Sequence, residues 1–183
     1  MIKTTDDHII ELIKNPKSLR KGFHLLVSTY SERIYWHVRR IVLTHEDAND
    51  TVQNTFMKAW MNIESFRGDA KLSTWLYRIA VNESLNLINR DKDRHATALD
   101  DPDLALENQL KSDPYFDGDE LDIEFQKAIN NLPEKQRLVF TMRYYDGLKY
   151  QDISTILGTS VGGLKASYHH ALKKIEEHIR SLD

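Results

Sequence analysis

Apolar residues recur at intervals of three and four along most of this 183-residue chain. That spacing places them on one face of an α-helix. A helix is predicted from Asp6 to Lys14, and a longer one follows with an apolar stripe made of Phe23, Leu26, Val27, Tyr30, Ile34, Val38 and Ile41. Alternation with period two never persists, so the pattern predicts an all-α fold.

Two more helices are predicted before residue 95. The first has the inward stripe Val52, Phe56, Ala59, Trp60 and Ile63. After a break at Gly68-Asp69, Ser73 and Thr74 give a helix start signal. The inward positions of the second helix are then Leu76, Ile79, Ala80, Leu85 and Ile88.

Helical periodicity returns after residue 125. Phe125, Ile129 and Leu132 precede Pro133, which suits the first turn of a helix that runs to a stop at Asp146-Gly147. A short helix is predicted over Tyr150 to Leu157, with Gly158 as its left-handed cap. Thr159 or Ser160 can cap the last helix, whose stripe is Leu164, Tyr168, Ala171, Leu172, Ile175 and Ile179.

Charge separates these two helical segments. Residues 1–95 carry 15 lysines and arginines against 12 acidic residues, and residues 125–183 carry nine against six. Between them, residues 96–124 hold one lysine and ten acidic residues. Repulsion between like charges favours an extended, mobile linker, although a solvated loop within one domain would have the same composition. We therefore predict domains at 1–95 and 125–183, joined by a flexible acidic linker at 96–124.

The segment after Gly158 has the form of a helix-turn-helix. Gly162 and Gly163 are poor helix formers, each less favourable than alanine by about 1 kcal/mol. Small residues there allow the front of a helix to approach a DNA groove closely, while cationic groups further along meet phosphates. A loose helix start at the surface is the alternative interpretation.

Composition excludes several other classes. The chain has no cysteine, and its start lacks the apolar run of a signal peptide. Neither a phosphate-binding loop nor an H-E-x-x-H zinc helix is present. Because His169 and His170 are adjacent, they point about 100° apart on a helix and are poorly placed to share a metal. We predict a cytoplasmic, non-enzymatic protein with no metal and no cofactor.

Three motifs in order resemble the sigma-70 family of bacterial RNA polymerase sigma factors, in the small extracytoplasmic-function (ECF) subgroup. They are DANDTVQNTFMKAW, FRGDAKLSTWLYRIAVNESLNLINR and LPEKQRLVFTMRYYDGLKYQDISTILGTSVGGLKASYHHALKKI. The resemblance covers nearly the whole chain except the linker. It implies sigma domain 2 at 1–95 and sigma domain 4, with its helix-turn-helix, at 125–183.

The resemblance assigns a polymerase-binding strip and a DNA-binding region to domain 2. In the family, a D-x-x-Q-x-x-F helix, here Asp50, Gln53 and Phe56, docks on the clamp helices of the polymerase largest subunit. The expected strip on the polar face of this helix is Asp47, Asp50, Gln53, Asn54 and Lys58, although a plain solvated face would look the same. The region that holds the melted minus-ten strand is Arg67, Lys71, Thr74, Trp75, Arg78, Asn82, Asn86 and Arg90. Its neighbours favour a core position for Trp75 over a stacking platform. Many relatives carry aspartate where this chain has Asn86, so promoter preference there is open.

In domain 4, the helices around Leu132–Leu148 resemble those that dock on the polymerase flap tip. The minus-thirty-five element would be read by Tyr150, Gln151, Gly162, Gly163, Lys165, Ala166, His169, His170 and Lys173. Relatives often have arginine at the positions of Ser167 and His170. Because arginine reads guanine bidentately, this chain is expected to make fewer guanine contacts.

The predicted function is therefore to bind core RNA polymerase and direct promoter-specific initiation. Promoter DNA and an anti-sigma factor, membrane-anchored in one arrangement, are the further partners that the family implies, without direct membrane association of this chain. The alternative from another class is a stand-alone helix-turn-helix regulator that uses the N-terminal domain for dimerisation. The polar strip at Asp50 and Gln53 argues against that alternative.

Overall fold

The computed structural model describes residues 5–42, 44–95, 102–113, 116 and 118–182, and within these ranges the secondary structure is helical without a strand. The chain divides into two compact units, one made mainly of residues up to Asn89 and the other mainly of residues from Arg90 onward. None of the described helices has the length and apolar character needed to cross a membrane.

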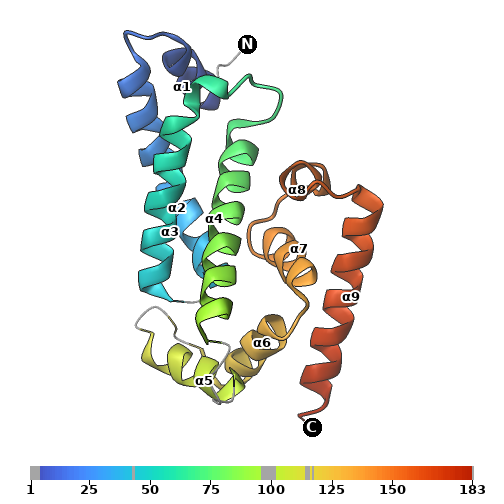
Figure 1. Ribbon diagram of the computed structural model, residues 1–183. Coiled ribbons are helices and arrows are strands. Elements are labelled where there is room, and N and C mark those ends of the chain that lie inside the picture. The colour runs from blue at the N-terminus through green and yellow to red at the C-terminus, as the bar shows by residue number, and fades with distance from the viewer. Residues whose placement is uncertain (1–4, 43, 96–101, 114–115, 117, 183) are drawn as a thin grey trace. The chain divides into compact units, whose positions relative to one another are not determined.

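Four α-helices build the N-terminal unit (Figure 1): α1 at Thr5–Lys14, α2 at Leu19–Val42, α3 at His45–Met61 and α4 at Leu72–His95. The Tyr30 hydroxyl on α2 donates a 2.6 Å hydrogen bond to Asp6 on α1. Burial and this carboxylate raise the pKa of Tyr30. His37 of α2 packs against Tyr77 of α4 with ring centroids 4.6 Å apart. These contacts tie both α1 and α4 to the long helix α2.

The buried face of α3 differs from the predicted stripe. Thr51 and Thr55 are buried, whereas Val52 is half-buried and Trp60 is 40% exposed. The Thr55 hydroxyl donates 2.7 Å to the carbonyl of Thr51 one turn earlier, so its polar atom is satisfied within the helix. The methyl group can then be buried at little cost, which a pattern of polar and apolar residues does not reveal.

The face of α4 is also rotated from the prediction. Leu72, Tyr77, Val81 and Ser84 are buried along with the expected Leu76 and Ala80. Ile79, Leu85 and Ile88 are only partly buried. The Ser84 hydroxyl donates 2.8 Å to the carbonyl of Ala80, so another polar residue is accommodated in the core by bonding to its own helix.

Gly22 lets α1 and α2 approach closely. A Cβ atom at this position would lie 2.8 Å from Cβ of Leu12 and 2.9 Å from the backbone nitrogen of Ile13. The backbone of α1 cannot move aside without disturbing its own packing. We expect Gly22→Ala to lower the free energy of unfolding, because overpacking costs roughly 1–3 kcal/mol and outweighs the ~1 kcal/mol gain in helix propensity.

Chemical denaturation of the full chain measures this effect. Glu32→Ala, at an exposed position of the same helix, is the matched control and should change stability little. A Gly22→Ala protein as stable as the wild type would show that the contact between α1 and α2 relaxes easily.

The C-terminal unit contains α5 at Pro102–Ser112, α6 at Glu120–Asn130, α7 at Glu134–Tyr144, α8 at Tyr150–Leu157 and α9 at Val161–Arg180. One hydrophobic cluster joins α6, α7 and α9 through Ala128, Ile129, Leu132, Phe140, Ala171 and Ile175. Phe140 lies at its centre, nearly parallel to Tyr144 and Tyr168 with ring centroids 5.0 and 5.8 Å away.

Local signals predicted the helix ends here well. Gly158 adopts the left-handed conformation, with φ of 63°, after α8, and the Ser160 side chain caps α9 by accepting from the Gly163 amide. One member of the predicted α9 stripe is wrong: Leu172 is 42% exposed. It follows Ala171 by one residue, and the 100° turn between neighbours carries it out of the cluster.

A helix occupies part of the predicted linker. The sequence analysis expected an extended chain over residues 96–124, but α5 is helical over Pro102–Ser112 and buries Leu106 and Leu110. Helix α6 also begins inside this range, at Glu120, where Asp119 and Asp122 form a reciprocal capping box. Residues 96–101, 114, 115 and 117 lie outside the described part of the chain. The acidic side chains therefore cap α6 and bond α5 to α6. The sequence analysis had considered only the repulsion between these acids, which favours an extended chain.

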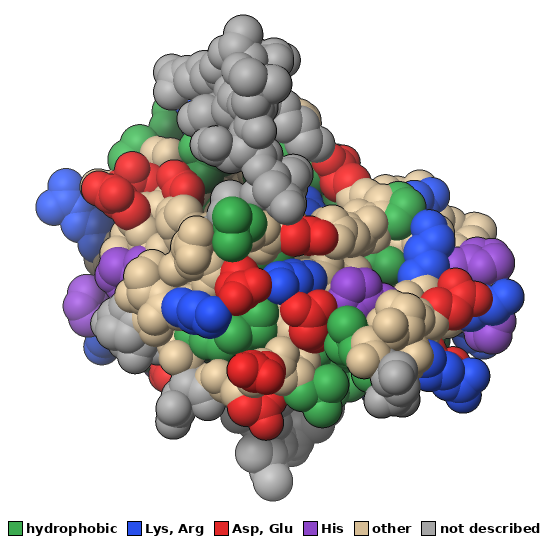
Figure 2. Space-filling model, turned by 90° about the horizontal axis from the view of Figure 1, so that it is seen from below, with side chains coloured by type: hydrophobic (Ala, Val, Ile, Leu, Met, Phe, Trp, Pro, Cys, Tyr) green, Lys and Arg blue, Asp and Glu red, His purple; other side chains and the backbone are tan. Residues whose placement is uncertain are grey.

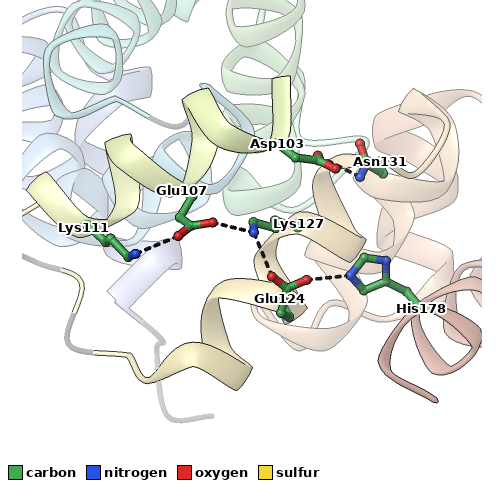
Figure 3. A network of polar contacts seen from close by, with 7 residues as sticks. All are labelled: Asp103, Glu107, Lys111, Glu124, Lys127, Asn131 and His178. Carbon is green, nitrogen blue, oxygen red and sulfur yellow. Dashed lines mark hydrogen bonds and ion pairs between the residues drawn. The ribbon is translucent and has the colours of Figure 1, made fainter. Parts of the chain in front are cut away.

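A chain of ion pairs runs from α5 through α6 to α9 (Figure 3). Glu107 accepts from Lys111 and Lys127, each at 2.6 Å. Lys127 also donates 2.7 Å to Glu124, which lies 3.1 Å from His178 on α9. The bonds from Lys111 and Lys127 lower the pKa of Glu107 from 4.5 to about 2. Glu107 and Glu124 raise the pKa of Lys127.

These pKa shifts predict how stability depends on pH. Because folding lowers the pKa of Glu107, the carboxylate stabilises the folded state above pH ~4.5, and the contribution is lost as pH falls towards about 2. Glu107→Gln should therefore be less stable than the wild type near neutral pH, and the difference should shrink as the solution is acidified. Urea unfolding of both proteins over this pH range is the measurement. A difference independent of pH would contradict an ionic role for Glu107.

Candidate functional site

A polar pocket lies between the end of α3 and the middle of α4. Its volume is about 660 Å³. Its polar lining includes Asn62, Arg78, Asn82, Asn86 and Asn89, and Trp75, Ile79 and Leu85 add apolar surface. Amide groups supply both hydrogen-bond donors and acceptors, and guanidinium supplies charged donors. Together with one indole ring, this lining suits the edges and faces of an unpaired base better than an apolar ligand.

Trp75 contributes to both the core and the pocket. It is half-buried and packs against the buried Phe66, with ring centroids 5.3 Å apart and planes 53° apart. The remaining part of the side chain lines the pocket. The two alternatives raised for this residue are therefore compatible, because a fixed indole ring is a better stacking surface than a mobile one.

The structure brings together four of the residues expected to hold the minus-ten strand: Trp75, Arg78, Asn82 and Asn86. Arg67, Lys71 and Arg90 are exposed but lie outside the pocket lining. Thr74 is buried in the core, so its side chain is not on the surface. The four clustered residues follow one another on α4 at steps of three or four residues, and that spacing gives them a common face.

Further pocket residues were missed by the sequence analysis. The missed residues include Asn89, which continues the expected Asn82 and Asn86 at positions i, i+4 and i+7 on one face of α4, and Asn62, which faces them from the end of α3. Asparagine is a weak helix former, so its repetition at helical spacing was an available signal. Glu83 also lines the pocket, where Lys58 pairs with its carboxylate and offsets the negative charge.

The five residues of the expected polymerase-binding strip do not share one environment. Asp47 accepts a 2.6 Å hydrogen bond from the Thr44 hydroxyl at the start of α3, so it serves the helix cap. Lys58 belongs to the polar pocket. Asp50 is exposed and Asn54 is half-buried. Gln53 lines a groove of a different kind.

That groove is apolar and lies between α2 and α3. Its volume is about 500 Å³, and it is lined by Phe23, Val27, Gln53, Phe56, Met57, Trp60 and Met61. Trp60 and Phe23 pack edge to face at 4.9 Å, while Met57 is 53% and Met61 77% exposed. Exposed apolar side chains gathered in a groove are typical of a protein-binding surface. Two methionines on the outward side of an amphipathic helix were the missed signal.

The helix-turn-helix of α8 and α9 presents one outward strip. Gly162, Lys165, Ala166, His169 and Lys173 are all exposed and recur at helical spacing. His170 and Gln151 are exposed as well. Tyr150 is half-buried, with the Arg143 guanidinium over its ring at 5.1 Å, so it supports the start of α8 from inside the unit.

The two glycines at the front of α9 have different surroundings. A Cβ at Gly162 would meet no atom within 4 Å, whereas one at Gly163 would lie 3.3 Å from the Ser160 hydroxyl and 3.4 Å from Thr159. Gly163 thus makes room for the helix cap. No packing contact among the described residues requires a glycine at position 162. The reason for a small residue there therefore lies on the outer surface of α9.

His169 and His170 have ring centroids 5.9 Å apart. In the described part of the chain, no cluster of three histidine or acidic side chains could hold a metal ion.

Two family models match this chain. Residues 26–94 match Sigma-70 region 2, and residues 122–175 match Sigma-70, region 4. The chain is 33% identical to the ECF RNA polymerase sigma-E factor of Haemophilus influenzae, over 97% of each protein. It is 31% identical to the RNA polymerase sigma-H factor of Pseudomonas aeruginosa, over 97% of this chain and 95% of that protein.

Two solved structures have similar folds. One is the sigma factor RpoE of Bartonella quintana, in complex with the anti-sigma factor NepR, with a TM-score of 0.71, 24% identity and coverage of 87% of this chain and 98% of that one. The other is CnrH in complex with the cytosolic domain of CnrY, with a TM-score of 0.70, 19% identity and coverage of 97% and 99%.

Proposed function

Because the chain belongs to the ECF subgroup of the sigma-70 family of RNA polymerase sigma factors and directs transcription initiation, we propose that three of its surfaces divide this work. The apolar groove binds core polymerase, the polar pocket holds the melted minus-ten strand, and the outward strip of α9 reads the minus-thirty-five element. The observation that carries the proposal is the pocket that joins Trp75, Arg78, Asn82 and Asn86.

The polar pocket has the chemistry that an unpaired base requires. Moving a base out of the duplex costs a few kcal/mol, which stacking on an aromatic ring and hydrogen bonds to the base edge must offset. Trp75 supplies the ring, Asn82 and Asn86 supply amides, and Arg78 supplies positive charge. Exposed Arg67, Lys71 and Arg90 are assigned to phosphates along the approaching strand.

The apolar groove supplies the polymerase-binding energy in this proposal. Gln53 at its edge and the exposed Asp50 beside it give polar contacts, while Met57, Trp60 and Met61 give apolar area. Methionine adapts its shape to a partner surface. The clamp helices of the largest polymerase subunit are the proposed ligand, and the helices around Leu132–Leu148 are assigned to the flap tip.

Reading of the minus-thirty-five element is assigned to α9. The first turn of a recognition helix contacts base edges in the major groove, and Gly162 and Ala166 leave room for that approach. Lys165, His169 and Lys173 follow on the same strip. The family supports a non-catalytic role for this chain in the cytoplasm, with an anti-sigma factor as its restraining partner.

Transcription by core RNA polymerase with and without this protein tests the proposed function. Only the complete mixture should initiate from a subset of genomic promoters, and the start sites should share two elements about 35 and 10 base pairs upstream. A protein that bound DNA but neither bound core polymerase nor changed its start sites would contradict the proposal and favour a stand-alone regulator.

Asn82→Ala tests the pocket at single-residue resolution. Loss of a hydrogen-bonded base contact costs roughly 1–3 kcal/mol, so initiation should fall about 10- to 100-fold at promoters with the preferred base. At the other bases the loss should be smaller, which relaxes preference at one minus-ten position. Transcription over a panel of single-base promoter variants measures this, with exposed Asn49→Ala on α3 as the matched control. An equal loss at every base would assign Asn82 to the DNA backbone.

A further inference from the structure

Helices α5 and α6 form an antiparallel pair. Asp103 at the start of α5 accepts a 3.0 Å hydrogen bond from Asn131, just past the end of α6. Four residues further along α5, Glu107 pairs with Lys127, which is four residues back from Asn131. Equal steps in opposite directions define one register (Figure 3). The buried Leu106 and Leu110 are four residues apart and therefore share one side of α5.

This contact is separate from the core of the C-terminal unit. Ala128 and Ile129 of α6 pack towards α7 and α9, whereas Lys127 points to α5. Loss of α5 would leave that core in place. Lys127 would also keep Glu124 as a partner at 2.7 Å, so no buried charge would be left unpaired. The structure therefore permits α5 to leave without unfolding the unit.

Helix α5 depends on its contact with α6. It has 11 residues, and isolated helices shorter than about 12–15 residues are marginal in water. Among the side chains of α5 that the structure describes, the buried apolar ones are Leu106 and Leu110. Two such side chains stabilise a short helix little by themselves, so α5 folds and docks together. Such a segment behaves as a tethered ligand, whose effective concentration is in the millimolar range for a short tether.

The surface beside α5 has exposed apolar side chains. A groove of about 460 Å³ is lined by Glu107, Lys111, Glu120, Leu121, Ile123, Glu124 and Leu182. Leu121 is 58% and Leu182 49% exposed. Figure 2 shows acidic, basic and histidine side chains alternating across this face beside a hydrophobic patch. A longer helix could bury these leucines as well, and each would add favourable apolar burial.

We propose that α5 is an exchangeable internal ligand that occupies a docking face on α6 for the acidic amphipathic helix of a protein partner. The partner helix carries an acidic side chain for Lys127 and leucine-like residues at the spacing of Leu106 and Leu110. Its additional contacts with Leu121 and Leu182 let it displace the tethered α5. This proposal is independent of the DNA-binding and polymerase-binding surfaces assigned above.

A peptide with the sequence of residues 102–112, carrying a fluorescent label, is the probe for this face. It is titrated against the full-length wild type and against the full-length Leu106→Asp/Leu110→Asp variant, whose own α5 cannot dock. We expect the variant to bind the peptide at least about tenfold more tightly than the wild type, because the tethered copy no longer competes. The same peptide with both leucines changed to aspartate is the matched control and should not bind.

A charge exchange tests the acidic part of the proposal. Adding Lys127→Glu to the variant should abolish binding of the native peptide, and a peptide with Glu107→Lys should restore it. Circular dichroism establishes that each variant unfolds cooperatively. If the aspartate variant does not, Glu107→Ala/Leu110→Ala takes its place.

Equal binding to wild type and variant would show that α5 does not cover the face. No binding to the variant up to millimolar peptide would show that the face does not accept an exchangeable helix. Unchanged binding of the native peptide after Lys127→Glu would show that the face does not require an acidic helix. Each of these three results would overturn the proposal.

Discussion

A protein with aspartate in place of both Met57 and Met61 is expected to fold normally and to bind core RNA polymerase at least about 100-fold more weakly. Both side chains are more than half exposed, and exposed substitutions usually change stability by ~0.5 kcal/mol or less. At an interface the same changes remove two apolar contacts and place two charges against apolar groups. Hot-spot residues near the centre of an interface contribute about 2 kcal/mol or more each, and we expect both methionines to be hot spots.

Competition with a labelled wild-type sigma factor for core polymerase measures this loss. His8→Asp, at an exposed position of α1, is the control for added negative charge and should bind normally. Gln53→Ala should weaken binding less, because it removes a polar contact at the edge of the groove. Phe56→Ala should unfold the N-terminal unit instead, since truncating a buried phenylalanine costs roughly 3–5 kcal/mol. Normal binding by the methionine variant would contradict the assignment of the groove to polymerase.

Gly162→Leu is expected to abolish initiation at promoters that need the minus-thirty-five element while leaving the C-terminal unit folded. A Cβ at Gly162 meets no atom within 4 Å, and leucine is the better helix former by nearly 1 kcal/mol. Stability should therefore stay equal or rise slightly. On the DNA, however, the larger side chain would stand between the first turn of α9 and the base edges.

Transcription over a panel of minus-thirty-five variants, with circular dichroism as the folding control, measures the effect. Gly163→Leu is the contrasting variant and should lose stability, because its Cβ would press on the Ser160 cap. Lys165→Ala should weaken binding at every sequence if Lys165 contacts a phosphate, and the salt dependence should fall by about one ion. Normal initiation by a folded Gly162→Leu protein would mean that Gly162 is only a loose start to the helix.

Local sequence signals predicted most helix ends because they act within a few residues. Gly158 after α8 and Ser160 before α9 lie where the sequence analysis expected them. Pro133, expected in the first turn of α7, is the N-cap residue immediately before it. Each satisfies or ends backbone hydrogen bonding in its own turn of helix. Each of the three motifs that identified the family is likewise contained in one continuous stretch of sequence. Distant parts of the chain do not enter such signals.

Faces and pockets were predicted less well. Thr51 and Ser84 lie in the core, while Trp60 and Leu172 are partly exposed. Hydroxyl side chains can bond to their own helix, and large apolar side chains can serve a binding surface. A polar or apolar label does not distinguish these cases. Helix α5 was missed for a related reason, since its acids suggested repulsion until Lys111 and Lys127 were placed beside Glu107.

The sequence by itself determined the helical class, most helix boundaries, the family and the helix-turn-helix, because periodicity, caps and motif spacing are properties of short stretches. Only the tertiary structure decided that Lys58 joins the pocket with Asn82, that Gln53 joins the methionines in the apolar groove, and that α5 packs on α6. Each of these depends on how one helix is rotated against another. That rotation is set by the packing of whole faces, which no short stretch of sequence contains.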